Sequence, residues 1–514
     1  MKDNWVFVFV LLAILPVLLL RDFTPGNELR YLSIADEALR NGTFVTFSNH
    51  GMVYADKPPI YFWIIMMGRW LLGGHYMWFL SLFSVIPAFV IVRTMDRWVA
   101  GKVDGEYRLT GKLLMLSCGL FTGIMIVLRM DMLMCMFITL SLYTFYRMMI
   151  REGNRRDNAI LFPVYVFLAV FTKGPVGILI PLAGTTAFLL LTGRIRSIGY
   201  YWGWRTWLVL LTCCSIWFMA VYMEGGWEYL HNLLFHQTMD RAVHSFHHEA
   251  PFYYYLISIW YSLLPWSLLL IGILAVAIYR RKVCTELQKF FLTIIGVSFL
   301  LLSLISSKIE VYMLPAFPFI VYLALTYFRY FKWNQWIAAS VGIPSVIFCL
   351  SVPVLIGLAK QDDSCFWGQR PFYIAAGVLT ITGFCSLYIL YHRKEIGRAI
   401  RTIAYGLFCS VFISSWALSG INGELGYREL CDKAAEIAGD GNATGYYVWK
   451  LYRPENMDVY LHKEIQAISP EELAASGLHG VVFMLPASRL KELPPYFSGR
   501  RIYGVGHYAI IMIH

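Results

Sequence analysis

Acidic and basic side chains that could act on a phosphate group recur in short polar segments of the sequence. Lysine and arginine suit a phosphate, because their N–H groups match its oxygens in charge and geometry. A carboxylate close to a bound phosphate suits a general base that takes a proton from an incoming hydroxyl or amine. The residues selected on these grounds are Glu28, Arg30, Asp56, Lys57, Asp131, Lys173, Arg241, Lys308 and, beside Lys308, Tyr312.

Several of these residues also have an interpretation without chemistry. Asp131 can form an ion pair with Arg129, two residues before it. Lys173 can extend along apolar surface and place its ammonium group among lipid headgroups. Lys308 can pair with Glu310. The functional interpretation therefore depends on whether side chains far apart in the sequence meet on the same face of a membrane.

Histidines concentrate in one polar segment, residues 224–255. They are His231, His236, His244, His247 and His248. Histidine is the commonest metal ligand, and the i, i+4 spacing of His244 and His248 places both on one face of a helix. No HExxH motif is present, so the sequence does not predict a protease-type zinc site. A loop whose histidines are solvated or packed against its aromatic residues is the alternative.

Long apolar runs separate the polar segments. The chain has 514 residues, of which 58% are hydrophobic and only 15% are charged, whereas soluble domains carry about 25% charged residues. Runs such as 176–192 and 290–306 approach the thickness of a bilayer's hydrocarbon core. In lipid they must be helical, because a helix satisfies its own backbone polar groups. The sequence therefore predicts a polytopic α-helical membrane protein.

Basic residues indicate which ends of these helices face the cytoplasm. Lys and Arg gather in six short loops between pairs of apolar runs, as in cytoplasmic loops. The net charge of +11 thus reflects orientation in the membrane, and we expect no nucleic acid as a partner. The selected residues then share the outer face. The expected thirteen spans are 5–20, 75–93, 112–128, 132–149, 158–172, 176–193, 206–223, 256–279, 290–306, 311–328, 336–358, 371–391 and 402–420.

One apolar run does not fit as a span. Ile60–Gly73 is short and contains Arg69 near its middle. If it crossed the membrane, every basic loop would lie outside. We therefore expect an amphipathic helix that lies in the membrane interface.

The last hundred residues have a different character. Short apolar stretches at 445–448, 481–484 and 508–513 alternate with helix-like segments, one of which opens with the capping pattern Ser-Pro-Glu-Glu. We expect a transmembrane domain over residues 1–420 and a small soluble α/β domain over residues 421–514, outside the membrane.

The order of the polar motifs resembles a known family. The motifs are ELRY, GTF, DKPP, RMD, TKGP, HHEAPFYYY, LLPW and SSKIEVYMLPAF, within residues 5–330. This order resembles the integral-membrane glycosyltransferases of the GT-C class, in particular the lipid A aminoarabinose transferase and protein mannosyltransferase-like group. The resemblance implies thirteen spans, juxtamembrane helices in the first outer loop and a periplasmic C-terminal domain. It also implies an active site at the outer face of the bacterial inner membrane.

The resemblance implies a role for each matching residue. Arg30, Lys57 and Tyr312 match positions that hold the lipid phosphate, and Lys173 and Lys308 match lysines near that site. Asp131 matches a required outer-loop aspartate. Asp56 and His248 match a carboxylate–histidine pair that holds a divalent metal, zinc in the first instance.

One position departs from the family pattern. Asn27 stands where the family has the first of two acids, so either Glu28 takes the role of the base, with Asp131 beside it, or this member is altered in activity. We expect an inverting enzyme that transfers a sugar from a polyprenyl-phosphate donor to lipid A, a cell-envelope glycan or a protein. The alternatives are a transporter or flippase of a lipid-linked substrate, and a lipid-phosphate binder without catalytic activity. A transporter is disfavoured because the charges lie at one membrane edge and no internal repeat is present.

Overall fold

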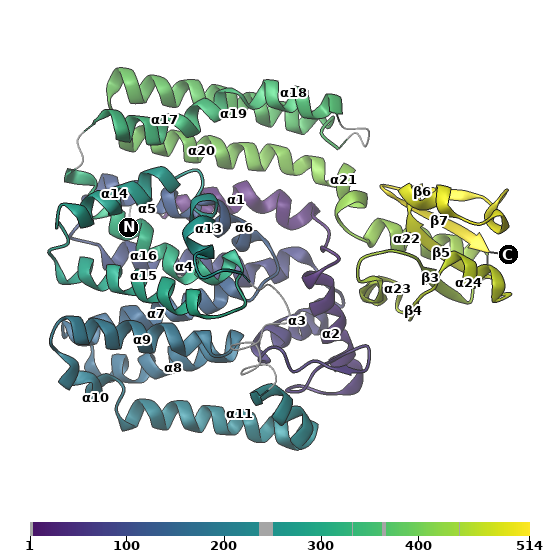
Figure 1. Ribbon diagram of the computed structural model, residues 1–514, viewed down its shortest axis with the longest axis horizontal. Helices are drawn as coiled ribbons and strands as arrows, with labels where there is room; N and C mark the ends of the chain where they lie inside the picture. The colour runs from purple at the N-terminus through teal and green to yellow at the C-terminus, as the bar shows by residue number, and fades with distance from the viewer. Residues whose placement is uncertain (1–3, 236–249, 331–332, 362–365, 442, 514) are drawn as a thin grey trace.

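A computed structural model describes residues 4–235, 250–330, 333–361, 366–441 and 443–513 (Figure 1). Helices make up most of the first 425 residues, and a small sheet follows near the C-terminus. Most of the long helices run side by side in a bundle, and the sheet projects beyond one end of it (Figure 1). The same end carries α2 (Asn27–Asn41) and α3 (Ile60–Leu72).

Several helices are long and apolar enough to cross a membrane. Among the described residues six qualify, or eight if each of two bent pairs counts as one span. Each of these six candidate spans contains one of the following helices: α4 (Met77–Trp98), α7 (Asp131–Met149), α11 (Trp204–His231), α15 (Glu286–Leu304), α19 (Arg370–Tyr388) and α20 (Ile396–Ser414). The bundle also contains α1 (Trp5–Leu20), α8 (Arg155–Lys173), α9 (Val176–Leu191), α13 (Tyr254–Ser262), α14 (Ser267–Tyr279) and α16 (Phe317–Leu325). The helical membrane protein is confirmed, whereas the count of thirteen spans stays a prediction.

Two of the predicted spans are bent helix pairs rather than straight helices. α5 (Gly105–Leu116) and α6 (Gly119–Ile126) meet at 64°, and α17 (Gln335–Cys349) and α18 (Ser351–Gln361) meet at 47°. At the first break the amide of Gly119 donates to the carbonyl of Leu264 at 2.7 Å. A helix can break at membrane depth where another protein segment takes over its backbone hydrogen bonds, and here the segment between α13 and α14 does so.

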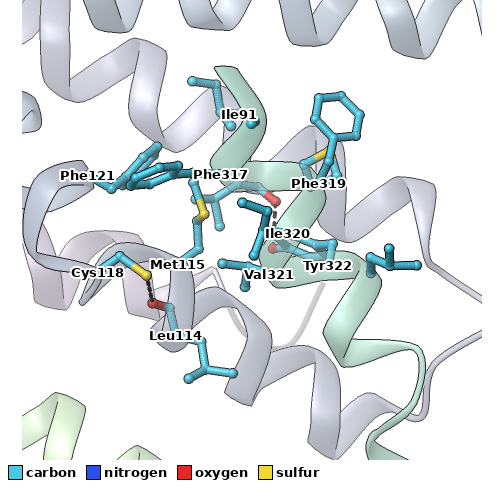
Figure 2. Packing of buried hydrophobic residues seen from close by; sticks show 14 of the residues in the cluster. Ile91, Leu114, Met115, Cys118, Phe121, Phe317, Phe319, Ile320, Val321 and Tyr322 are labelled. Carbon is cyan, nitrogen blue, oxygen red and sulfur yellow. Dashed lines mark hydrogen bonds between the residues drawn. The ribbon is translucent and has the colours of Figure 1, made fainter. Parts of the chain in front are cut away.

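The core of the bundle surrounds α16. Every residue of this helix is buried, which is typical of a helix that contacts protein on all sides. Figure 2 shows Phe317 and Ile320 of α16 among side chains of α5 and α6, including Met115 and Phe121. The Tyr322 hydroxyl donates to a backbone carbonyl of α4 at 3.1 Å, so its polar atom is satisfied within the core.

The helix α3 lies beside α2 at the end of the bundle (Figure 1). It begins after Pro59 and ends at Gly73, whose φ of 71° a residue with a side chain rarely adopts. Phe62 and Ile65 are fully buried, whereas Trp70 is exposed. This two-sided character agrees with the expected amphipathic helix.

The C-terminal region contains a mixed five-stranded sheet in the order β4-β3-β5-β7-β6. The strands are β3 (Gly445–Val448), β4 (Ile465–Ala467), β5 (Val481–Pro486), β6 (Ile502–Val505) and β7 (Tyr508–Ile513). β3 pairs in parallel with β4 and β5, and β7 runs antiparallel to β5 and β6. The expected helices form as α22 (Arg428–Asp440) and α24 (Pro470–Ala475), and Ser469 and Glu472 make the capping box at α24. A small C-terminal sheet region is thus confirmed.

Asp22, just after α1, ties the segment between α1 and α2 to the C-terminal region. Its carboxylate accepts from the Arg428 amide at 2.9 Å and from the Tyr460 hydroxyl at 2.7 Å. Its own amide donates to Oδ1 of Asn422 at 3.1 Å. A Cβ on Gly426 would lie 2.0 Å from Asp22 Oδ2, so glycine is required at this close approach. Nearby, α2 and α3 share a buried apolar cluster with α22 and the sheet.

Candidate active site

Asp131, the first residue of α7, lies buried between two cations. Its side chain is 2% exposed. Nζ of Lys173, the last residue of α8, donates to Oδ1, and Nε of Arg129 donates to Oδ2 at 3.0 Å. A buried carboxylate is costly unless it is paired and hydrogen-bonded, so both cations stabilise its charge. Lys173 is therefore directed into the protein and not toward lipid headgroups.

Residues from other polar segments surround Lys173. Its Nζ lies 4.6 Å from the ring centroid of Tyr312, a cation–π contact. The ammonium group of Lys57 is close enough to repel that of Lys173. Nζ of Lys57 in turn lies 3.5 Å from Oδ2 of Asp56. The fold thus brings together groups from four segments that are far apart in the sequence.

Arg30 is held by aromatic rings and by Asn27. Its guanidinium carbon lies 5.8 Å from the ring centroid of Tyr31 and 5.5 Å from that of Tyr54. Nη2 of Arg30 donates to Oδ1 of Asn27 at 2.8 Å. The hydroxyl of Tyr54 donates to Oδ2 of Asp56 at 3.2 Å. Asn27, at the position where the family pattern has an acid, is a neutral acceptor that orients Arg30.

Tyr31 links the Asp131 pair to the Arg30 group. Burial raises the pKa of Tyr31 to about 12; the charges of Asp131 and Asp56 add to this effect, and those of Arg129 and Arg30 oppose it. Four charged groups of the cluster therefore act on this one phenol. The hydroxyl keeps its proton at neutral pH and is available as an O–H donor inside the cluster.

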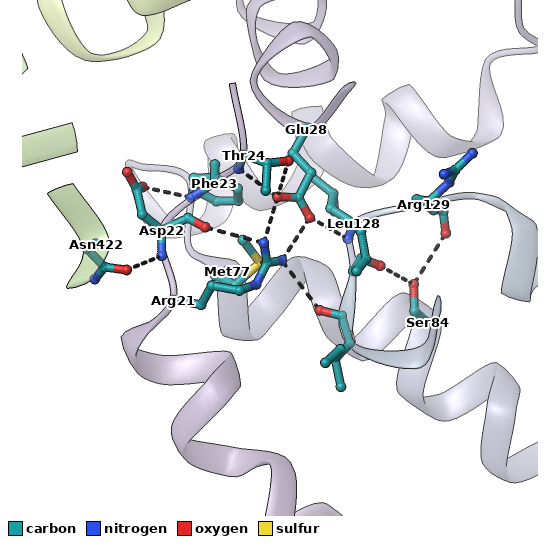
Figure 3. Close-up of polar contacts among 12 residues, drawn as sticks. Arg21, Asp22, Phe23, Thr24, Glu28, Met77, Ser84, Leu128, Arg129 and Asn422 are labelled. Carbon is teal, nitrogen blue, oxygen red and sulfur yellow. Dashed lines mark hydrogen bonds and ion pairs between the residues drawn. The ribbon is translucent and has the colours of Figure 1, made fainter. Parts of the chain in front are cut away.

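Glu28 belongs to a hydrogen-bond network with Arg21 (Figure 3). Its two oxygens accept from the two terminal nitrogens of Arg21, each at 2.8 Å. Glu28 also accepts from the amide and hydroxyl of Thr24, at 2.7 and 2.9 Å, and from the amide of Leu128 at 2.8 Å. Its side chain is 1% exposed. Five donors therefore use the acceptor capacity of this carboxylate.

The Glu28 network weakens its case as the base. Burial alone would raise the pKa of Glu28, but the hydrogen bonds and charge of Arg21, with the amides of Thr24 and Leu128, lower it below its ordinary value. A carboxylate stabilised in its charged form is a poor proton acceptor. Its predicted catalytic role remains a prediction, and its contacts indicate a structural one.

The same network fixes the segment before Asp131. Nη2 of Arg21 donates to the carbonyl of Ile126 at 3.4 Å, and Ser84 Oγ donates to the carbonyls of Val127 and Arg129 at 3.2 and 3.3 Å (Figure 3). Figure 3 shows the side chain of Arg129 pointing away from the Arg21–Glu28 pair. Arg21 and Glu28 therefore hold the backbone that leads into Asp131.

Lys308 precedes Tyr312 by four residues and contacts another segment. It is buried, and its Nζ donates to the carbonyl of Ala250 at 2.9 Å. Glu310 accepts from the hydroxyls of Tyr254 and Tyr261, at 2.6 and 2.7 Å. Lys308 thus anchors the chain where it enters α13, and the contacts of Glu310 were not foreseen from sequence.

Comparison with known proteins identifies the fold. No family model matches the chain. It is 28% identical over 363 residues to an uncharacterized protein of Aquifex aeolicus, which covers 68% of each chain. It is 25% identical over 427 residues to the undecaprenyl phosphate-alpha-4-amino-4-deoxy-L-arabinose arabinosyl transferase of Edwardsiella ictaluri. This aligned region covers 80% of this chain and 70% of the relative. The structure of ArnT from Cupriavidus metallidurans bound to undecaprenyl phosphate superposes with a TM-score of 0.76 and 17% sequence identity. The match covers 99% of this chain and 98% of the ArnT chain. The chain has the GT-C glycosyltransferase fold.

The GT-C fold confirms the resemblance inferred from the order of sequence motifs. Two residues predicted for the GT-C site, Arg241 and His248, lie outside the described residues. The predicted metal pair is therefore described only at Asp56, which contacts Tyr54 and Lys57. Within the described ranges no group of three metal-ligating side chains comes together. The Lys57 ammonium, so close to Asp56, would compete with a metal for this carboxylate.

Sequence reasoning missed three residues of the candidate site. Arg129 was considered only as a possible partner of Asp131, yet it joins the cation cluster. Arg21 follows directly after α1, and a basic residue at the end of an apolar helix is usually explained by its position at the membrane edge. Tyr31 lies inside the ELRY motif, one residue after Arg30, and that motif was the available signal.

Proposed function

We propose that this GT-C protein transfers a sugar from a polyprenyl-phosphate donor to an acceptor of the cell envelope, with lipid A as the first candidate. The observation that carries this proposal is the meeting of cations around buried Asp131 at the bundle end next to α2 and α3. The sequence relatives, whose names state an undecaprenyl phosphate donor, support it.

The charges of the cluster suit a reaction that develops negative charge on a phosphate. Four cations and two carboxylates leave an excess of two positive charges. They are Arg30, Lys57, Arg129 and Lys173, with Asp56 and Asp131. A sugar–phosphate–lipid diester carries one negative charge, whereas the released phosphate monoester carries close to two at neutral pH. Fixed cations therefore stabilise the leaving group more than the bound donor, which is the requirement for catalysis.

The chemical step exchanges one C–O bond for another. The acceptor oxygen attacks the anomeric carbon of the sugar, and the bond from this carbon to the phosphate oxygen breaks. The bonding electron pair stays on that oxygen, so polyprenyl phosphate leaves, and the acceptor proton goes to Asp131. Attack from the side opposite the phosphate inverts the anomeric carbon. Asp131 is preferred to Glu28 as the base, because Glu28 is engaged with five donors.

The position of the site supports a lipid-linked donor. Asp131 and Lys173 lie at the ends of α7 and α8, where apolar helices give way to the outer loops. A polyprenyl chain can stay in the bilayer there while its phosphate reaches the cations. We propose thirteen spans over residues 1–420, with this site and the domain of residues 421–514 on the periplasmic side. A divalent metal, zinc in the first instance, at Asp56 and His248 belongs to the same proposal.

The test is release of undecaprenyl phosphate from an undecaprenyl-phosphate-linked aminoarabinose by the purified full-length protein, with lipid A as acceptor. The wild-type protein should release it and form glycosylated lipid A. Asp131→Asn should lower the rate by at least about a hundredfold. Asp432→Asn, which alters an exposed acid on α22, is the matched control and should keep the wild-type rate. Absence of release from this donor and from other polyprenyl-phosphate sugars would leave only a binding or transport function.

A further inference from the structure

Both carboxylate oxygens of Asp131 are occupied by cations in this structure, which makes it a weak base. Lys173 donates to Oδ1, and Arg129 donates to Oδ2. Each cation stabilises the charged carboxylate, so the paired group accepts a proton poorly. Efficient catalysis by Asp131 therefore requires that one of the two cations leaves it.

The two cations are held with different firmness. Arg129 is anchored through its own backbone, because Ser84 donates to its carbonyl at 3.3 Å. Its guanidinium is rigid and planar, whereas the Lys173 ammonium ends a flexible four-carbon stem. Lys173 is the last residue of α8, followed by Gly174 with a φ of 94°. The charge of Lys57 repels the ammonium of Lys173, which opposes its pairing with Asp131.

We propose that Lys173 is a donor-responsive switch on Asp131, an inference that rests on the proposed function. Without donor, the Lys173 ammonium pairs with Asp131. When a polyprenyl phosphate group binds, the ammonium moves to a phosphate oxygen beside Lys57 and Tyr312. No covalent bond changes and Lys173 keeps its three protons; one ion pair replaces another. Asp131 is left with Arg129 alone, so the base becomes stronger as the leaving group gains a cation.

In this proposal Lys173 acts as a positioning residue that changes its partner, whereas in a fixed ion pair it would stay with Asp131 throughout the reaction. The titratable and charged groups that face Asp131 are Arg129, Lys173, Tyr31, Tyr61 and Cys135. Only Lys173 changes partner in the proposal. In a plot of rate against pH, the fall on the acid side (the acid limb) reports the pKa of the base. The acid limb of kcat/KM reports this pKa in the free enzyme, and the acid limb of kcat reports it in the enzyme–substrate complex. In the wild type the acid limb of kcat should therefore lie at higher pH than that of kcat/KM.

Lys173→Gln separates the switch from a permanent pair. It should move the acid limb of kcat/KM to higher pH, because the free enzyme loses a cation beside Asp131. It should leave the acid limb of kcat in place, because Lys173 has already left Asp131 in the complex. Equal movement of both limbs would show a permanent pair, and movement of neither would show that Lys173 does not act on Asp131. Either result overturns the proposal. Lys491→Gln, which alters an exposed lysine of the C-terminal region, is the control, and neither of its limbs should move.

A binding experiment tests the exchange without turnover. Undecaprenyl phosphate is titrated into purified full-length protein in detergent, and its Kd is measured for the wild type, Asp131→Asn, Lys173→Gln and the double variant. Asp131→Asn should bind about tenfold more tightly than the wild type, since the carboxylate no longer competes for Lys173. Lys173→Gln should bind about tenfold more weakly. In the Lys173→Gln background, Asp131→Asn should give little further gain.

The outcomes distinguish the switch from simple electrostatics and from failure of the proposed function. An equal gain from Asp131→Asn in both backgrounds would mean only that a negative charge was removed. No gain in either background would mean that Asp131 does not compete for Lys173. Both results overturn the switch while the wild type still releases undecaprenyl phosphate. Failure of the wild type to release it overturns the proposed function instead. If a variant does not fold, as judged by thermal unfolding, the wild-type pH profiles decide: acid limbs of kcat and kcat/KM at the same pH would overturn the switch.

Discussion

Replacing Glu28 with glutamine separates a positioning role from a catalytic one. Glu28 is 1% exposed and its partner Arg21 is 12% exposed, so Glu28→Gln leaves an arginine charge largely buried without a counter-ion. Breaking such a pair from one side costs about 3–5 kcal/mol. The glutamine NH2 group would also face a donor from Arg21, Thr24 or Leu128. We expect a lower free energy of unfolding and a displaced backbone before Asp131.

The pH dependence of this loss has a defined sign. The pKa of Glu28 is lowered from its ordinary value of 4.5, because Arg21 and two amides outweigh burial. A carboxyl with a lowered pKa contributes stability above its unfolded-state value and loses it as the pH falls through the folded-state value. The difference between wild type and Glu28→Gln should therefore be complete at pH 7 and shrink below pH 4.5. Thermal unfolding in detergent across this range measures it, with exposed Glu471→Gln as the control.

A paired replacement supplies the refutation. Arg21→Met combined with Glu28→Met removes both charges and keeps side chains of similar length. An apolar pair of this kind often restores the stability lost by a single change. If Glu28 only positions Asp131, the double variant should regain stability and a measurable part of the transfer rate. A Glu28→Gln protein that is fully stable but inactive, with a double variant that also stays inactive, would refute this reasoning and make Glu28 the base.

Three further predictions follow from other contacts. Lys57→Gln should weaken binding of undecaprenyl phosphate by about tenfold at low salt, measured by titration, because one charge-assisted contact is lost; unchanged affinity would remove Lys57 from the phosphate site. Glu224→Gln should raise proteolytic cleavage in the segment between α2 and α3, since Glu224 accepts from the amides of Phe44, Val45 and Thr46, and equal cleavage would contradict this anchoring role. Asp22→Ala should lower the unfolding temperature and increase protease release of the C-terminal region, and a protein as resistant as wild type would argue against the Asp22 contacts as the tether.

Local patterns in the sequence were sufficient for much of the fold. The apolar runs predicted the helices, and Ser469 with Glu472 predicted the start of α24. The edge strands β4 and β6 were not predicted, because they are short and at most half-buried, so they lack a strong apolar pattern. The bend between α5 and α6 was also missed, since it depends on a hydrogen bond to Leu264, far away in sequence.

The candidate site was predictable in its members but not in its pairings. Residue type and membrane orientation selected Arg30, Lys57, Asp131 and Lys173, and the fold brings them around Tyr31 and Tyr312. The pairings depend on the directions in which side chains point at the ends of four loops. The periodic pattern of apolar residues in the sequence carries no information on these directions. Glu28 illustrates this limit, because an acid next to a basic residue looks the same in sequence whether it faces a substrate or a buried arginine.

The contacts of Asp22 also constrain how the protein is made. Asp22 leaves the ribosome early, but Asn422, Arg428 and Tyr460, its partners, are about 400 residues away. The end of α1 therefore waits through the synthesis and insertion of nearly the whole chain before the buried carboxylate of Asp22 gains these distant donors. Until then, of its donors in the described part of the chain, only the neighbouring amide of Phe23 is at hand, which donates to it at 2.7 Å. Contacts of such sequence separation form slowly, and incomplete chains expose the surfaces that should meet. The segment after α1 thus reaches its final contacts last, so a chain truncated before Asn422 leaves Asp22 without the three partners that tie it to the C-terminal region.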